Sequence, residues 1–108
     1  MLLSIFPTLH EALDDILPLD TEYCLITHQL EAGTKIAPHY HDIAHEWVLL
    51  DTKGEINVLY GTQWKELVLG KGAITVIHFP PNRIHGLEAM TPIKYFVIRS
   101  SADDTHYL

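Results

Sequence analysis

Four residues in the middle of the chain have the types and the spacing of metal ligands. His39 and His41 stand two positions apart, Glu46 follows five residues later, and His85 lies just after a Pro-Pro-Asn corner. Residues two apart in a β-strand project from the same face, so both histidines could bind one ion. Neutral imidazoles and a carboxylate suit Fe(II), Mn(II), Ni(II) or Zn(II), and such sites usually keep positions for water or substrate. The sequence therefore predicts a divalent metal site of His39, His41, Glu46 and His85.

The acidic ligand has a competing candidate one residue earlier. Glu46 alternates with apolar Val48 and Leu50 on one face of its predicted strand, where a lone carboxylate is unfavourable unless it is paired or bound to metal. His45 could instead complete the ligand set with the other three histidines. We favour Glu46 because its face of the strand is the core face, which leaves His45 at the pocket rim or outside.

Other residues of chemical interest have structural interpretations. His78 precedes the corner and is either a pocket residue or a histidine of the core that supports the ligands. His10 and His28 are expected to be surface or otherwise satisfied residues. Cys24 is the single cysteine, so no intramolecular disulfide can form, and we expect it to be a buried small hydrophobic residue.

The elements that must position these residues are mostly strands. Thr8 and Glu11 form a capping box, and apolar residues at helical spacing predict a short helix over 9–17, ended by Pro18. From residue 22 the pattern changes to period two, with turns at Gly33, Gly54 and Gly61. The predicted strands are 23–30, 35–41, 46–51, 55–60, 64–69, 73–79 and 93–99. Residues 100–108 read as a mostly polar tail.

The length of 108 residues fits one domain, 1–108, with a barrel core over about 22–100. Hydrophobic residues make up 47% of the chain, which is enough to fill a core of that size. Short strands at intervals of about eight to twelve residues are typical of an all-β sandwich or barrel. We therefore expect an all-β domain with a short N-terminal helix.

Charge restricts the possible partners. Seven Lys and Arg stand against fourteen Asp and Glu, a net charge of −7 that repels phosphate backbones and anionic membranes. The chain shows neither a signal peptide nor a membrane-spanning segment, so we expect a soluble cytoplasmic protein that binds neither nucleic acid nor membranes. The apolar residues Trp47 and Leu49, expected to point outward, leave area that a second copy could cover, and a homodimer is expected.

At this point the sequence resembles the cupin superfamily. Its first motif, Gly-x5-His-x-His-x3,4-Glu-x6-Gly, is met by Gly33, His39, His41 and Glu46, with Gly54 one position late. Its second motif, Gly-x5-Pro-x-Gly-x2-His-x3-Asn, is met at Pro80 and His85. Asn82 replaces the inner Gly, Ala89 replaces the closing Asn, and Gly72 lies two residues too far upstream. Asn tolerates the left-handed conformation that Gly supplies, so the corner is expected to form.

The resemblance implies a small jelly-roll β-barrel that holds the metal in its interior. The chain also resembles cupin dioxygenases in its set of three histidines and one glutamate. We therefore expect a non-haem metal-dependent dioxygenase, an oxidoreductase with Fe(II) as the foremost metal, acting on a small organic molecule. The alternatives are a binding protein without turnover and a metal-assisted isomerase or lyase. Arg83 and Arg99 are the only arginines, which disfavours a phosphorylated sugar with several anionic contacts.

Overall fold

The structure is a computed structural model that describes residues 2–16, 24–70, 72–101 and 105–108. Ten strands and one helix occur in this part of the chain. The elements are β1 (Leu2–Phe6), α1 (Leu9–Ile16), β2 (Cys24–Leu30), β3 (Lys35–His41), β4 (Glu46–Leu50), β5 (Gly54–Tyr60), β6 (Gln63–Leu69), β7 (Ile74–Phe79), β8 (His85–Ala89), β9 (Ile93–Arg99) and β10 (Thr105–Tyr107). The prediction of an all-β protein with a short N-terminal helix is confirmed.

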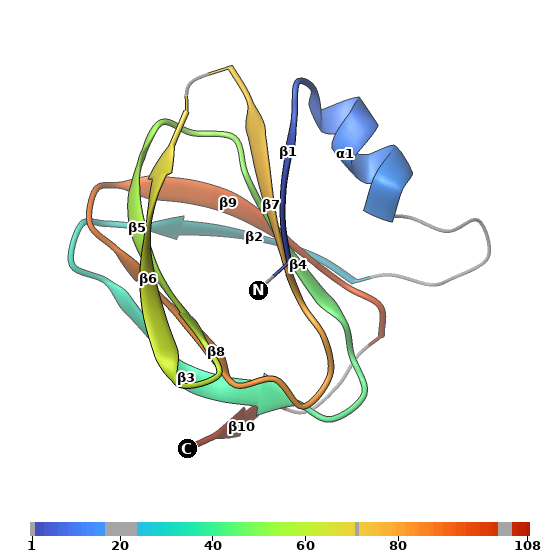
Figure 1. Ribbon diagram of the computed structural model, residues 1–108, viewed down its shortest axis with the longest axis vertical. Coiled ribbons are helices and arrows are strands. Elements are labelled where there is room, and N and C mark those ends of the chain that lie inside the picture. The colour runs from blue at the N-terminus through green and yellow to red at the C-terminus, as the bar shows by residue number, and fades with distance from the viewer. Residues whose placement is uncertain (1, 17–23, 71, 102–104) are drawn as a thin grey trace.

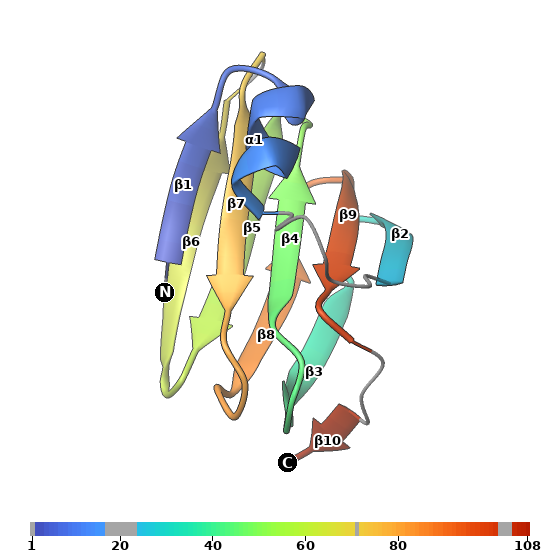
Figure 2. The same ribbon diagram turned by 90° about the vertical axis from the view of Figure 1, so that its right-hand side faces the viewer.

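The strands form two five-stranded antiparallel sheets that face each other. One sheet has the order β1-β7-β4-β9-β2 and the other the order β10-β3-β8-β5-β6. Figure 1 shows the chain enclosing the space between the sheets, and Figure 2 shows the sheets as two layers with α1 outside the first. No helix in the described ranges is long and apolar enough to span a membrane.

Each face of the first sheet has its own hydrophobic cluster. The inner cluster fills the space between the sheets and includes Val48, Leu87 and Val97. The outer cluster packs α1, through Ala12 and Ile16, against outward residues of β4, β7 and β9. Side chains of β4 alternate between the inner and the outer cluster, so both faces of this strand are covered and apolar. Its sequence therefore reads as a nearly continuous hydrophobic run.

The outer cluster corrects one expectation about the surface. Leu49 was expected to be available to a partner, but it is 1% exposed because it lies in the cluster under α1. Trp47 is partly buried against the same cluster. The helix of this chain therefore covers the apolar face that we had assigned to a second copy, and the homodimer itself stays a prediction.

Three strands were absent from the sequence prediction. β1 and β8 were not predicted, and residues 100–108 were predicted as a polar tail although they contain β10, which pairs with β3. The remaining strands agree with the prediction to within one residue in the described ranges. The end of the predicted helix at residue 17, and the side chain of Cys24, lie outside the part of the chain that the structure describes.

The corner between β7 and β8 forms as predicted. Asn82 adopts a positive φ of 63°, the left-handed conformation that Asn tolerates better than most residues. Its backbone N–H donates to the carbonyl of His41 at 2.7 Å, which ties the corner to the end of β3. This bond brings the start of β8, and with it His85, beside His41.

A bulge in β3 lies against a glycine of β8. The register of β3 and β8 shifts between Ile36 and His39, so both side chains face the space between the sheets. A Cβ at Gly86 would lie 3.0 Å from the carbonyl oxygen of Ile36 and 3.6 Å from the Cα of Pro38. The close approach of the two backbones therefore requires glycine at this position.

We expect Gly86→Ala to lower the free energy of unfolding by about 1–3 kcal/mol, because the added methyl group presses on backbone that cannot rotate away. Urea denaturation followed by circular dichroism measures this. Gly70→Ala is the matched control, since a Cβ there meets no described atom within 4 Å. Equal stability of the two variants would contradict this account of the bulge.

Candidate metal centre

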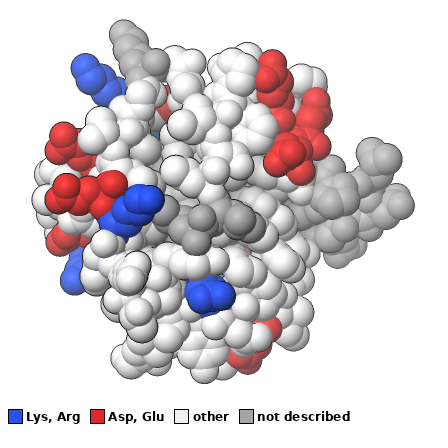
Figure 3. Space-filling model, in the orientation of Figure 1, with Lys and Arg blue, Asp and Glu red and all other residues white. Residues whose placement is uncertain are grey.

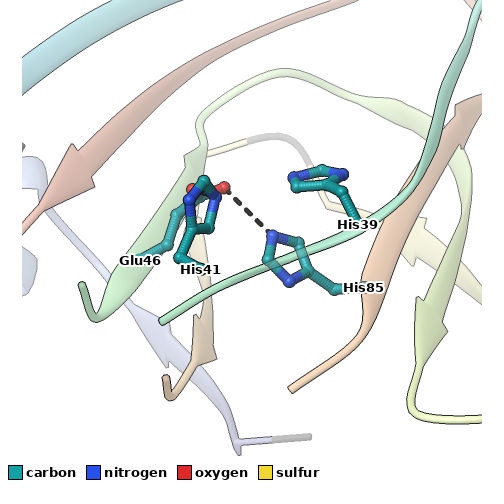
Figure 4. A group of neighbouring side chains, drawn as sticks. All are labelled: His39, His41, Glu46 and His85. Atoms are coloured by element: carbon teal, nitrogen blue, oxygen red, sulfur yellow. Dashed lines mark ion pairs between the residues drawn. The ribbon is translucent and has the colours of Figure 1, made fainter. Parts of the chain in front are cut away.

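The four predicted ligands come together between the two sheets. His39 and His41 lie on β3 and His85 on β8, all in one sheet, whereas Glu46 lies on β4 in the other. Each residue offers a ligand atom, and these atoms all lie within 4.8 Å of one another. Figure 4 shows the side chains converging on one point from the opposed strands. The group could hold one metal ion, and all four residues are buried.

Strand pairing explains the convergence. His39 pairs with His85 across β3 and β8, so the two rings stand side by side with centroids 4.3 Å apart. Glu46 is the first residue of β4 and pairs with Arg99 on β9 and Phe79 on β7. Residues directly opposite in a sheet share a face, so the Arg99 side chain is directed to the same space as the Glu46 carboxylate.

Two of the imidazoles are oriented by backbone carbonyls. Nδ1 of His39 lies 2.7 Å from the carbonyl oxygen of Ala37, and Nδ1 of His85 lies 2.9 Å from that of Arg83. A carbonyl only accepts, so the proton of each ring is on Nδ1 and the lone pair is on Nε2. Both Nε2 atoms are thereby prepared to bind a metal.

Buried nitrogens without partners test whether the group fits a metal. Both ring nitrogens of His41 and Nε2 of His85 have no hydrogen-bond partner within the described ranges. Nε2 of His41 is 3.0 Å from Oε2 of Glu46, and Nε2 of His85 is 3.5 Å from Oε1, but neither contact has hydrogen-bond geometry. Unsatisfied buried nitrogens are unfavourable, and a divalent ion at this point would bind one ring nitrogen of His41 and Nε2 of His85. The donor set therefore fits the implied metal.

The Glu46 carboxylate is kept ionised by its neighbours. Burial alone would raise the pKa of the carboxyl group, but His41, His85 and Arg99 outweigh it and hold the pKa far below its usual range. Arg99 donates from Nε to Oε2 at 2.9 Å. The carboxylate is thus deprotonated, the form that metal binding requires.

The alternative ligand set is not assembled. His45 lies on the other face of the sheet, where its Nδ1 is 2.9 Å from Nε2 of His78. Both rings stack with Trp47, at centroid distances of 5.7 Å and 4.9 Å. His78 is therefore an outer-face residue and neither a pocket nor a supporting histidine, and the preference for Glu46 over His45 agrees with the geometry.

A cavity of about 390 Å³ adjoins the candidate ligands. His39, Glu46 and His85 form one part of its wall, and apolar residues such as Val48 and Val97 form another. Its lining also includes His28, Leu30, Ile36, Phe79, Leu87, Tyr95, Arg99, Thr105 and Tyr107. The ion that the group could hold would thus border a space large enough for a small organic molecule.

Sequence reasoning missed several of these wall residues. His28 is half-buried and stacks on Tyr95 with ring centroids 5.2 Å apart, and both line the cavity. Tyr107 belongs to the segment expected to be a polar tail, and its ring centroid lies 5.6 Å from that of His39. The alternation of 93, 95, 97 and 99 in the predicted last strand was a usable signal for Tyr95 and Arg99, because one face of that strand had to line the core.

No protein-family model matches the chain, and no curated protein matches it in sequence. Solved structures do match. A double-stranded β-helix domain protein from Klebsiella pneumoniae has a TM-score of 0.67 at 14% identity, over 84% of this chain and 74% of that one. A cupin superfamily protein from Desulfitobacterium hafniense has a TM-score of 0.58 at 16% identity, over 80% and 72%.

A third similar structure is a variant of salicylate 1,2-dioxygenase from Pseudoaminobacter salicylatoxidans, with a TM-score of 0.54 at 23% identity. The match covers 72% of this chain but 21% of the dioxygenase. At such identities the likeness concerns the fold. The two facing antiparallel sheets and these neighbours together establish that the chain has the jelly-roll fold of the cupin superfamily.

Proposed function

We propose that the protein is a metal-dependent dioxygenase in which His39, His41, Glu46 and His85 hold one divalent ion, with Fe(II) as the native metal. The observation that supports this most is the convergence of three imidazoles and one carboxylate at the wall of a cavity of about 390 Å³. The likeness in fold to a salicylate dioxygenase adds support. The substrate is proposed to be a small organic molecule.

Different residues have different roles in the proposed site. The carbonyls of Ala37 and Arg83 hold two imidazoles in the tautomer that presents Nε2. Arg99 holds Glu46 by one oxygen and keeps the carboxylate charged. The apolar walls exclude water from the substrate. A bound Fe(II) would supply the redox chemistry with dioxygen, which Zn(II) lacks.

We expect His39→Ala, His41→Ala, Glu46→Ala and His85→Ala each to weaken metal binding at least about tenfold, because each removes one donor from a small set. Metal content after dialysis, measured by elemental analysis of protein without a histidine tag, gives the result. His45→Ala and His78→Ala are the controls, since both side chains lie on the outer face. Loss of metal from His45→Ala together with retention by Glu46→Ala would overturn the ligand assignment.

We expect Fe(II) to restore oxygen uptake with a suitable substrate, and Zn(II) to occupy the same ligands and inhibit. An oxygen electrode and a panel of small organic acids and phenols, salicylate among them, provide the measurement. His85→Ala is the inactive control. Turnover that is equal with Zn(II) and Fe(II) in the absence of oxygen would refute the oxygenase and favour an isomerase or lyase. Metal binding without turnover of any kind would favour a binding protein.

The metal-free protein should lose stability as the pH falls from about 7.5 to about 5.5. Burial lowers the pKa of the His39 imidazole below its ordinary value of 6.5, although the Ala37 carbonyl opposes this. Below pH 6.5, His39 therefore binds a proton in the unfolded chain but stays neutral in the folded chain. The free energy of unfolding decreases as the pH is lowered through this range.

Urea denaturation with a chelator present measures this slope. His39→Gln should make the slope shallower, and His78 should retain part of it because burial lowers its pKa as well. His10→Gln is the control at an exposed histidine. A metal-free wild type that is equally stable at both pH values would contradict the burial of a neutral His39.

A further inference from the structure

Two polar groups in the cavity wall have hydrogen-bonding capacity that no described residue uses. The Tyr95 hydroxyl is buried without a hydrogen bond, on a side chain that is only 1% exposed. The Arg99 guanidinium carries five N–H donors, and among the described residues only Glu46 accepts from it, through Nε. Both side chains line the cavity. The terminal nitrogens of Arg99, whose side chain is 22% exposed, are available to a molecule inside it, whereas the Tyr95 hydroxyl lies just behind the wall and is reached when neighbouring side chains shift.

The two groups stand at either end of an apolar stretch. Tyr95, Val97 and Arg99 alternate along β9 and therefore share the inner face of the sheet. Arg99 contacts Glu46 and so lies at the candidate ligands, whereas Tyr95 stacks on His28 farther along the strands. Val48, Leu87 and Val97 supply apolar surface in the same wall. The cavity thus has a cationic end, an apolar middle and a hydrogen-bonding end.

The surface of the protein is acidic, whereas the lining of the cavity carries cationic groups. The chain carries a net charge of −7, and in Figure 3 acidic side chains gather in patches at the left and at the upper right. Among the described residues that line the cavity, Glu46 is the only carboxylate and is already paired with Arg99, whereas Lys35 adds a second cation. A cationic ligand would meet a guanidinium without a free carboxylate, so the interior favours an anion.

We propose that the cavity binds a small monocarboxylic acid with an apolar body and a second hydrogen-bond acceptor, the carboxylate at the terminal nitrogens of Arg99 and the acceptor at the Tyr95 hydroxyl. The proposal rests on the proposed function in taking this cavity as the substrate site. It goes further by naming the substrate class and two residues that select it.

The chemistry of both groups fits this class. A guanidinium presents parallel N–H donors that match the two oxygens of a carboxylate. One arginine can neutralise a single negative charge. Lys35 also lines the cavity, but it is exposed and its Nζ lies over the Trp64 ring, so Arg99 is the cation beside the candidate ligands. Burial, with a smaller effect from Glu46, raises the pKa of the Tyr95 phenol, so the hydroxyl keeps its proton and can donate it to an acceptor.

Binding to the Zn(II)-loaded protein tests the carboxylate end without any oxygen chemistry. Isothermal titration calorimetry would compare para-acetylbenzoate with para-acetylbenzamide, and hexanoate with hexanamide as a flexible pair. Each carboxylate should bind about tenfold tighter than its amide, because a charge-assisted hydrogen bond contributes more than a neutral one. Arg99→Gln should abolish the difference. Lys94→Gln is the control, because this cation of β9 is exposed and lies outside the cavity lining.

The acceptor end is tested with an isosteric pair. Tyr95→Phe should weaken para-acetylbenzoate about fivefold and leave para-isopropylbenzoate unchanged, because only the acetyl group accepts a hydrogen bond. Tyr40→Phe is the matched control, since that ring stacks on His106 on the outer side of β3. Elemental analysis of each variant verifies that zinc is retained.

The outcomes separate the two proposals. Carboxylate preference without oxygen uptake would sustain the substrate class and refute the dioxygenase. Oxygen uptake with neutral substrates, together with equal binding of acids and amides, would sustain the dioxygenase and refute the substrate class. The substrate class is also overturned if no carboxylate binds, or if Lys94→Gln weakens binding as much as Arg99→Gln.

Discussion

The arrangement of the candidate site depends on one buried negative charge. Glu46 is 5% exposed and keeps its charge between two sheets, a position that is unfavourable unless every oxygen has a partner. Arg99 supplies a charged hydrogen bond from the neighbouring strand, and His41 and His85 approach from the opposite sheet. The carboxylate is therefore the point at which the two sheets are connected by polar rather than apolar contacts.

This charge also fixes the register of the first sheet. With Glu46 inside, the inner residues of β4 are Val48 and Leu50, and the outer ones are Trp47 and Leu49. A slip of one residue would bring His45 and Trp47 into the cavity and expose Glu46 and Leu50 to the outer face. Whether Glu46 or His45 faces the cavity is thus the same question as the register of β4, and the packing of Leu49 under α1 accompanies the register in which Glu46 does.

Local patterns in the sequence explain which parts of the fold were predictable. Strands with clear alternation and glycine turns, such as β3 and β5, were predicted because their inner and outer residues differ in type. β8 contains Gly86 and is only five residues long, and β10 has three residues that pair only with β3 among the described strands. Such strands form because neighbouring strands pair with them, and they show little alternation of apolar and polar residues in the sequence.

The same distinction holds for the site. The four candidate ligands were recognisable because their residue types and spacing are unusual, and three of them lie within a short segment. Alternation along β9 places Tyr95 and Arg99 on one face, but the place of His28 beside them became clear only from the pairing of β2 with β9. Residues that select a ligand are therefore harder to predict than residues that bind a metal.

The proposed metal and the proposed acid are energetically linked through Glu46 and Arg99. With neutral imidazoles, the carboxylate and the guanidinium cancel, so the buried group is neutral without a metal. A divalent ion on the same carboxylate would leave two uncompensated positive charges in a space of low dielectric, which is unfavourable. A monocarboxylate beside Arg99 removes one of them. Each ligand should therefore strengthen binding of the other, since coupling between two sites is reciprocal. An acidic protein could in this way admit anionic molecules chiefly when its metal site is loaded.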